Sequence, residues 1–315
     1  AGNTCFFRAF IHSCGRTKYD CILSIFIVEI NRYPLHNMNA TKHILLFGAG
    51  KSATVLIDYL KRIATVKKWQ VTIVDVNLAA VQSKVGNHEW VKAVGVSIEN
   101  ESERKALISK AAVVISLLPP ALHYQVALDC LAFEKHLLTA SYADDKIKAL
   151  ADQLKKKGIL FLCEMGLDPG IDHMSAMQLI HRIKKEGGHI HSFLSHCGGL
   201  VAPESDDNPW HYKISWNPRN VVMAGNAGAV YKEKSKIKNQ KYEGLFADCA
   251  EVSIDGLGKL AYYPNRNSLS YIPVYGLEEA DTFIRTTLRH PDFCNVWQLI
   301  VQLGLTDEEK MVNTD

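Results

Sequence analysis

The sequence contains no apolar run long enough to span a bilayer, for which roughly 20 residues are needed. The closest approach, Ile22–Ile30, is far too short. An excess of charge of either sign is also absent, because 36 Lys and Arg oppose 33 Asp and Glu for a net charge of +3. That balance argues against nucleic acid or an anionic membrane as a partner. With 47% hydrophobic residues, the chain is too apolar to be disordered over most of its length.

Cysteine is present without any pattern: none of the eight cysteines belongs to a Cys-x-x-Cys pair. A fold of this length that was held by disulfides would be denser in cysteine, so the sequence favours a reducing compartment. We therefore expect a cytoplasmic protein, with the mitochondrion as the alternative. Five cysteines are scattered through the chain and are expected to be isolated thiols, namely Cys130, Cys163, Cys197, Cys249 and Cys294.

The first 37 residues differ from the rest of the chain. They show neither the two-residue nor the 3.6-residue apolar period. Because Met38 comes just before the first expected strand, residues 1–37 are interpreted as a non-native or disordered leader. An organelle transit peptide is the alternative, since the early basic residues of this segment come without carboxylates.

From Lys42 onward, short apolar segments alternate with segments of helical period. Strands that are apolar throughout and separated by helices indicate a parallel sheet covered on both faces. The sequence therefore predicts an α/β fold, with a doubly wound parallel-sheet dinucleotide-binding domain over residues 42–165. The expected strands are 43–47, 71–74, 91–98, 113–116, 136–139 and 159–162, and the expected helices are 52–63, 78–85, 101–110, 122–133 and 144–157.

The first strand is followed by Gly48-x-Gly50-x-x-Ala53, a variant of the dinucleotide-binding fingerprint. Gly48 permits a tight turn, Gly50 lets the backbone approach a pyrophosphate, and Ala53 permits close packing of helix on strand. The motif is specific here because it lies between a buried strand and a helix. The residues of this loop expected to bind the coenzyme are Gly48, Ala49, Gly50, Lys51, Ser52 and Ala53.

Asp75 closes the second strand, where a carboxylate accepts the hydroxyls of the adenine ribose and repels a 2′-phosphate. The sequence therefore predicts NAD as the cofactor in preference to NADP. The alternative is that Asp75 only ends a strand.

Two other patterns imitate catalytic or metal sites. Tyr142-x-x-x-Lys146 has the spacing of a short-chain dehydrogenase pair, but Tyr142 directly follows a strand instead of lying on a helix. His189-x-His191 would share one face of a strand, but no third ligand at metal-site spacing accompanies the pair. We expect no metal site.

The second half of the chain carries a series of distinctive motifs. They are Val114–Pro120 with His123, Thr139–Tyr142, Glu164–His173, Cys197–Glu204, Asn208-Pro209, Tyr212–Trp216, Pro218-Arg219, Tyr263–Arg266 and Tyr275-Gly276. Taken in this order, from about Lys42 to the C-terminus, they resemble the saccharopine dehydrogenase (glutamate-forming) family, also called saccharopine reductases. Leu167–His173 and Tyr263–Arg266 are the most specific pieces.

The resemblance implies an NAD(P)-dependent oxidoreductase of lysine metabolism that acts on a CH–NH bond. Such enzymes convert saccharopine and water to glutamate and 2-aminoadipate 6-semialdehyde, or run the reverse condensation. It also implies a second α/β domain for substrate binding and dimerisation, here over 166–276. A helical insertion would begin over 277–315, with helices at Thr282–Leu288 and Cys294–Leu303. Because the family continues past Asp315, we expect a C-terminally truncated chain that is a homodimer when full length.

Saccharopine carries three carboxylates and a secondary amine, so its site should supply cations and an acid–base group. Asp168, Asp172 and His173 follow the sixth strand, at the edge where α/β folds bind ligands, and are the catalytic candidates. The alternative for Asp168 is to cap a helix opened by Pro169. The expected substrate-binding residues are Pro119, Pro120, Ser141, Tyr142, Arg219, Asn265, Arg266 and Asn267, and those expected beside the nicotinamide are Leu118, Pro119 and Ser141.

Arg266 is expected to clamp a substrate carboxylate from a turn fixed by Pro264 and Asn265, with an exposed, solubilising arginine as the alternative. Asn267 stands where the family usually has Asp, so a charge that would pair the substrate ammonium is missing. Two other functions stay open. One is a related C–N bond reductase, such as a carboxyspermidine-type enzyme, and the other is an inactive fragment that only binds NAD.

Overall fold

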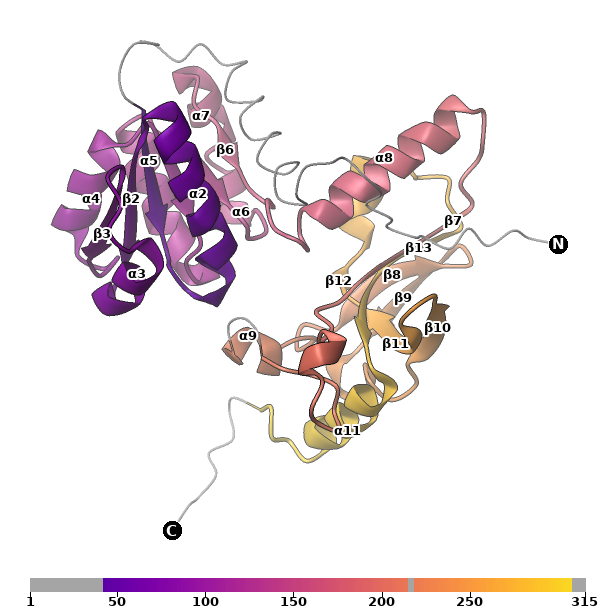
Figure 1. Ribbon diagram of the computed structural model, residues 1–315. Helices are drawn as coiled ribbons and strands as arrows, with labels where there is room; N and C mark the ends of the chain where they lie inside the picture. Colours follow the sequence, from indigo (N-terminus) through magenta and orange to yellow (C-terminus); the bar gives the residue numbers. More distant parts are fainter. Residues whose placement is uncertain (1–41, 215–217, 308–315) are drawn as a thin grey trace. The chain divides into compact units, whose positions relative to one another are not determined.

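The computed structural model describes residues 42–214 and 218–307, which form two compact units that divide after Ile171 (Figure 1). The first unit comprises residues 42–171 and the second comprises residues 172–307, and each is described by itself. The leader expected over residues 1–37 lies outside the described residues. Within the described ranges, no helix combines the length and the apolar character needed to cross a membrane.

The first unit is built on a six-stranded parallel sheet with the order β3-β2-β1-β4-β5-β6. This order places β1 and β4 side by side at the point where the chain reverses its direction of winding. The doubly wound fold predicted from the sequence is confirmed. Its strands are β1 His43–Phe47, β2 Gln70–Asp75, β3 Val91–Gly95, β4 Val113–Ser116, β5 His136–Thr139 and β6 Phe161–Leu162.

Helices cover both faces of this sheet because successive residues of each buried strand point to opposite sides. On β1, Leu46 packs with α2 Thr54–Lys67 and α3 Leu78–Val85. Leu45 and Phe47 pack on the other face. The helices of that face are α4 Glu101–Lys110, α5 His123–Ala132, α6 Asp145–Lys148 and α7 Ala151–Lys157, and short 3-10 turns lie at Lys51–Ala53 and Pro120–Leu122.

The second unit contains a mixed seven-stranded sheet in which β13 pairs with β7, β8 and β11. The pairings of β13 with β7 and of β12 with β8 are parallel, and the others are antiparallel. The strands are β7 Ser192–Cys197, β8 Ala229–Glu233, β9 Lys236–Gln240, β10 Ala250–Ile254, β11 Gly258–Pro264, β12 Arg266–Asn267 and β13 Thr282–Arg289.

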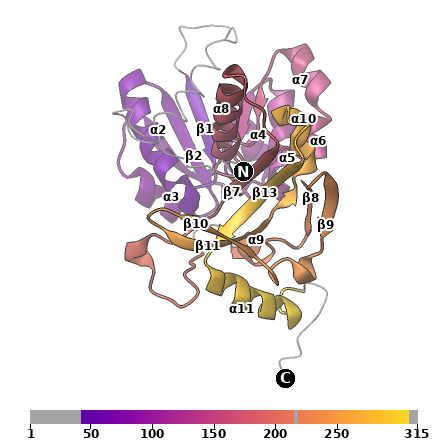
Figure 2. The ribbon, with the colours of Figure 1, turned by 90° about the vertical axis from the view of Figure 1, so that its right-hand side faces the viewer.

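Four helices accompany this sheet: α8 Ile171–Lys185, α9 Pro218–Val222, α10 Ile272–Tyr275 and α11 Pro291–Gln302. Ala176 and Ile180 of α8 pack on Phe193 of β7 and Phe283 of β13. The apolar stripe of α11, which includes Phe293, packs against residues of β8 and β11, and Figure 2 shows α11 beside β11. Single 3-10 turns occur at Pro203–Ser205, Tyr242–Gly244 and Leu269–Tyr271.

The helix expected at Thr282–Leu288 is wrong, because this segment is β13. The segment contains three Thr and one Ile, whose branched Cβ atoms favour strands, and most of its residues are buried. The proposed start of a separate helical part at residue 277 therefore cuts through the sheet of the second unit. The helix expected at Cys294–Leu303 is confirmed as α11.

The five cysteines that the structure describes are free thiols. The expectation of isolated thiols is confirmed for these five, and Cys249 Sγ donates to the Phe246 carbonyl at 3.6 Å. Burial raises the pKa of Cys163 to about 11. That thiol is therefore a poor nucleophile at neutral pH.

A buried ion pair ties α4 to α5 in the first unit. Arg104 Nε donates to Asp129 Oδ2 at 2.6 Å, and both side chains are 7% exposed. The same guanidinium donates to the Ile98 carbonyl at 2.6 Å. Removal of one partner from such a pair leaves an uncompensated buried charge, which costs far more than the pair itself contributes.

We predict that Asp129→Leu destabilises the first unit by about 3–5 kcal/mol, because Arg104 keeps its charge without a carboxylate. The measurement is urea unfolding followed by circular dichroism. Glu101→Gln is the control, since Glu101 pairs with Lys105 on the exposed face of the same helix and its loss should leave the midpoint unchanged. Equal unfolding midpoints for the two variants would contradict a stabilising role of the buried pair of Arg104 and Asp129.

Candidate functional site

The glycine loop of the first unit leads from the end of β1 into α2. Gly48 has a φ of 97°, and a Cβ there would lie 2.8 Å from the Leu117 carbonyl oxygen, so only glycine fits. A Cβ at Gly50 would meet nothing within 4 Å. The helical turn that begins at Lys51 has no side-chain cap and no acidic residue in its first turn. Its backbone N–H groups are thus oriented for an anion, which fits the pyrophosphate of a dinucleotide.

Asp75 holds this loop against β2. Its Oδ2 accepts a hydrogen bond from the Ala49 amide at 2.8 Å, and its Oδ1 accepts one from the Asn77 amide at 3.1 Å. From the other side, the Lys84 ammonium donates to the carbonyl oxygens of Ala49 and Gly50, both at 2.7 Å. The carboxylate therefore ties the glycine loop to the end of β2.

His123 organises the ends of β4 and β5. Its Nδ1 lies 2.8 Å from Ser116 Oγ, and its Nε2 lies 2.8 Å from Ser141 Oγ and 3.2 Å from Thr139 Oγ1. The side chain is buried, and that burial lowers its pKa to about 4. His123 is thus a neutral positioning residue for Ser141. In the sequence His123 was only part of a motif, although its place at the start of a helix, three residues after Pro120, was a usable signal.

Tyr142 and Asp168 meet in the same unit. The Tyr142 hydroxyl donates to Asp168 Oδ1 at 2.8 Å, and the neighbouring Ala143 amide donates to Glu164 Oε1 at 3.2 Å. Lys146, the other half of the imitation dehydrogenase pair, has its ammonium over the Tyr124 ring instead. Because α8 begins at Ile171, Asp168 is not placed to cap a helix opened by Pro169.

The strand β4 carries the remaining expected residues of the first unit at its carboxyl end. Leu118, Pro119 and Pro120 follow it in a loop, and Leu118 packs partly against the core while both prolines are exposed. Ser141 follows β5 at the same edge of the sheet. The structure therefore brings the glycine loop, Asp75 and Ser141 to one edge, as the sequence predicted for parallel strands.

Asp172 and His173 lie at the start of α8 in the second unit, where they join a buried cluster. Asp172 Oδ2 pairs with the Arg285 guanidinium at 2.9 Å, with side chains only 5% and 3% exposed. Arg285 also lies 4.4 Å from the centre of the Tyr271 ring, on which the His173 ring stacks. His173 Nδ1 lies 2.5 Å from the Tyr275 hydroxyl. Sequence reasoning missed Arg285, because an arginine inside a misassigned helix gave no sign of burial.

Arg266 and Asn267 form the short strand β12. Pro264, expected to fix a turn, is instead the last residue of β11, where it pairs with Thr286. The bend comes at Arg266, whose φ is 50° and whose side chain is exposed. Asn267 Oδ1 accepts hydrogen bonds from two backbone amides, of Leu269 and Ser270. A carboxylate or an amide fills that turn-forming role equally well, so the Asp-to-Asn departure has a local structural use.

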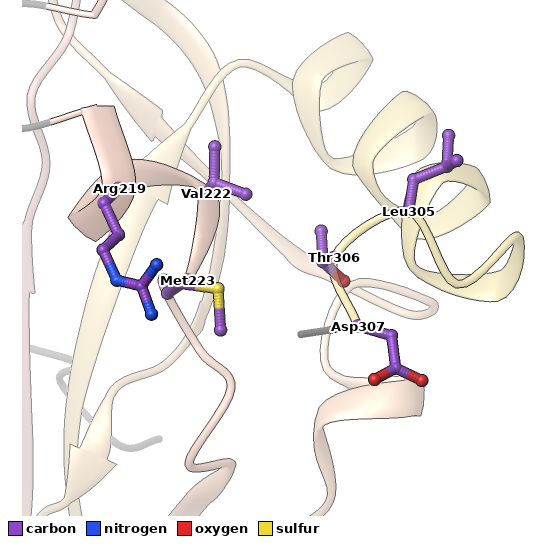
Figure 3. A pocket seen from close by; sticks show the side chains of 6 residues that line it. All are labelled: Arg219, Val222, Met223, Leu305, Thr306 and Asp307. Atoms are coloured by element: carbon purple, nitrogen blue, oxygen red, sulfur yellow. The ribbon is translucent and has the colours of Figure 1, made fainter. Parts of the chain in front are cut away.

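Arg219 lies on α9, which forms one side of an open pocket of about 310 Å³. Figure 3 shows the side chains around it, with α9 on one side and the segment after α11 on the other. The lining residues are Arg219, Val222, Met223, Leu305, Thr306 and Asp307. The lining includes one cationic and one anionic side chain, Arg219 and Asp307.

The strand order, the glycine loop and the uncapped helix start define a dinucleotide-binding domain of the kind that carries nicotinamide coenzymes. Comparison with protein families agrees. The saccharopine dehydrogenase NADP binding domain matches residues 44–162, and the saccharopine dehydrogenase C-terminal domain matches residues 166–315. The chain therefore belongs to the saccharopine dehydrogenase family, a family of oxidoreductases, and the resemblance seen in its motifs is confirmed.

Curated relatives support the same assignment. The chain is 34% identical over 268 residues to the NADP, L-glutamate-forming saccharopine dehydrogenase of Saccharomyces cerevisiae, which covers 85% of the chain and 59% of the yeast protein. It is 35% identical over 301 residues to alpha-aminoadipic semialdehyde synthase of Arabidopsis thaliana, covering 89% of the chain and 28% of the relative. The chain thus spans only part of both relatives.

A solved structure of the apo yeast saccharopine dehydrogenase (L-Glu forming) resembles this fold. It aligns with a TM-score of 0.74 at 34% sequence identity, over 84% of this chain and 59% of the yeast chain. The shared fold therefore includes the parallel sheet of the first unit and extends into the second.

The neutral state of His123 makes stability depend on pH. The folded form has a pKa of about 4 against an ordinary value of 6.5, so below about pH 6.5 the unfolded chain binds a proton that the folded chain does not. We predict that stability is full above about pH 7. It should fall by on the order of 3 kcal/mol as the pH drops from 6.5 towards 4.

The measurement is the free energy of unfolding of the wild type and of His123→Gln between pH 4.5 and 7.5. Gln does not titrate, so the difference between the two proteins isolates His123 from other acid-sensitive groups. A difference that stays constant over this range would contradict a buried, neutral His123.

Proposed function

We propose that this chain belongs to an enzyme that oxidises the secondary amine of saccharopine with NADP and water, giving glutamate and 2-aminoadipate 6-semialdehyde, or catalyses the reverse. The observation that carries the proposal is the 34% identity to a glutamate-forming saccharopine dehydrogenase over most of the chain. The coenzyme, when bound, supplies the hydride acceptor. The proposal includes a homodimer, which light scattering would test.

The choice of NADP replaces the NAD preference expected from Asp75. That expectation assigned the carboxylate to the ribose hydroxyls, whereas both of its oxygens accept backbone amides. Lys51 is exposed directly after Gly50, and the Lys84 ammonium lies against the same loop. These two cations belong to the loop region that a 2′-phosphate would approach, and they favour a phosphate there. The names of the matched family domain and of the yeast relative support the same choice.

Acid–base chemistry is assigned first to Asp168. It lies on the same edge as Ser141 and Tyr142, and the Tyr142 hydroxyl donates to it, so a proton can pass between the two oxygens. Asp172 is committed to Arg285 in a buried pair and is assigned a positioning role, against the earlier catalytic expectation. His173, held by Tyr275, is the second acid–base candidate.

Binding of the substrate carboxylates is assigned to the exposed guanidinium of Arg266, with Asn265 and Asn267 shaping its bend, and to Arg219 in the open pocket. Pro119, Pro120 and Ser141 shape the approach to the nicotinamide. Guanidinium groups suit this role because their paired N–H donors match both oxygens of a carboxylate.

The test is a steady-state assay of the chain, with the yeast saccharopine dehydrogenase as the positive control. NADPH formation from saccharopine, with glutamate as product, supports the proposal. Reaction with carboxyspermidine but not with saccharopine would instead indicate a carboxyspermidine-type reductase. Coenzyme binding by the chain without turnover of either substrate would favour a protein that only binds the coenzyme.

We predict that Asp75→Ala weakens NADP and NAD binding by similar factors, about tenfold or 1.4 kcal/mol each, because it releases the loop that both share. Asp58→Ala, an exposed carboxylate on α2, is the control and should change neither. The measurement is calorimetric titration with each coenzyme. Loss of NAD affinity alone would indicate that Asp75 binds the ribose hydroxyls of NAD, and it would overturn the NADP assignment.

We also predict that Arg266→Lys raises the KM for saccharopine at least about tenfold, because the charge stays while the bidentate geometry is lost. Arg182→Lys, on the exposed last turn of α8, is the matched control and should leave KM unchanged. Both variants are measured in the same steady-state assay, together with the Kd for NADP. An unchanged KM, or an equal loss of NADP affinity, would remove Arg266 from the substrate site.

A further inference from the structure

Two histidines and an aspartate meet at the start of α11 in the second unit. His290 caps this helix, Asp292 lies in its first turn, and His211 comes from the loop before α9. One possible ligand atom from each residue lies within 4.8 Å of the other two. The imidazole rings of His211 and His290 are in contact, with centroids 3.9 Å apart. Over residues 42–214 and 218–307, this is the single group of three such side chains with that spacing.

A second carboxylate orients His211. Its Nδ1 lies 2.6 Å from Asp206 Oδ2, so Nδ1–H donates to that oxygen and Nε2 carries the lone pair. A histidine that donates to a carboxylate through one nitrogen and offers the other is the usual arrangement of a metal ligand. The backbone of His211 also lies in the left-handed region, with a φ of 50°.

The surroundings leave the group accessible. His211 and His290 are half-buried and Asp292 is exposed. Arg289, the nearest cation in sequence, is buried, and its guanidinium lies 4.9 Å and 5.4 Å from the ring centres of Tyr212 and Phe293. That charge is therefore engaged with the aromatic core.

We propose that His211, His290 and Asp292 bind one divalent cation of the zinc class, with Asp206 as the residue that orients His211. Imidazole and carboxylate ligands suit Zn²⁺, and bonds of roughly 2.0–2.1 Å in a tetrahedral site place ligand atoms about 3.3 Å apart. Rotation of the partly exposed side chains closes the remaining distance. The ion would join the loop around residues 206–211 to the start of α11, two segments far apart in the sequence.

His189 and His191, the pair with metal-ligand spacing in the sequence, form a weaker candidate site and provide a control. His189 and His191 also stack, with ring centroids 5.5 Å apart. Their neighbouring carboxylate, Glu279, lies 3.9 Å from His189, and both of these side chains are largely exposed. This pair therefore has the residue types of a metal site without a carboxylate in hydrogen-bond contact to orient a ring.

The experiment titrates the whole chain with Zn²⁺ in competition with a chromogenic chelator. We expect one tight equivalent in the wild type, and a tenfold to hundredfold weaker one in Asp206→Asn. His211→Asn and His290→Asn should each remove it, and Asn at position 290 still caps α11 because its side-chain oxygen replaces the ring acceptor. The double variant His189→Asn/His191→Asn should bind as the wild type does.

Cobalt(II) distinguishes this site from the free cysteines, because thiolate ligands add an intense near-ultraviolet charge-transfer band. We expect visible absorption from one Co²⁺ without that band, and its loss in His290→Asn. Circular dichroism verifies that each variant is folded, and Asp206→Asn gives a graded test if a histidine variant is not. Wild-type affinity in the cluster variants, loss of binding in the His189/His191 variant, or a thiolate band would each overturn the proposal.

Discussion

The glycine loop depends on being held by charges from two sides. The Asp75 carboxylate accepts the Ala49 amide, and the Lys84 ammonium donates to the carbonyls of Ala49 and Gly50. Each hydrogen bond to a charged group is worth about 1.5–3 kcal/mol, more than a neutral one. Since the loop leaves β1 at the point where the winding reverses, its shape determines what the crevice beside β4 can hold.

Two further devices keep functional side chains in place, one in each unit. In the first, a neutral His123 at the start of α5 connects the last residues of β4 and β5 to Ser141, so these segments share one hydrogen-bond network. In the second, the buried pair of Asp172 and Arg285 joins the start of α8 to β13. In both cases a buried polar side chain, His123 or Arg285, would be costly to bury without its hydrogen-bond partners. The surrounding segments must therefore keep the arrangement that supplies those partners.

The first unit was largely predictable from sequence because its information is local. Buried parallel strands are continuous apolar runs, and the helices between them carry the apolar period, so element positions followed within a few residues. The second unit was harder, since its sheet pairs strands from distant parts of the chain. Thr282–Leu288 was misassigned because one short segment does not reveal that three strands, β7, β8 and β11, will cover it.

The candidate site shows the same division. The fingerprint placed Gly48–Ala53 and Asp75 at one edge, but residue types alone could not show that the Asp75 oxygens would accept amides of Ala49 and Asn77. Likewise, Arg285 and the contact of His211 with His290 depend on tertiary pairing. Spacing in sequence instead pointed to His189 and His191, which lack an orienting carboxylate in hydrogen-bond contact.

The central claim is that the glycine loop binds a nicotinamide dinucleotide. The most direct measurement is calorimetric titration of the wild type and of Gly50→Val with NADPH. A side chain at position 50 meets no protein atom within 4 Å, and the extended backbone there suits valine, so the fold should be preserved. We expect one NADPH per wild-type chain and at least tenfold weaker binding in the variant, because the side chain blocks the pyrophosphate. Equal affinity in a folded variant, or no binding by the wild type, would contradict it.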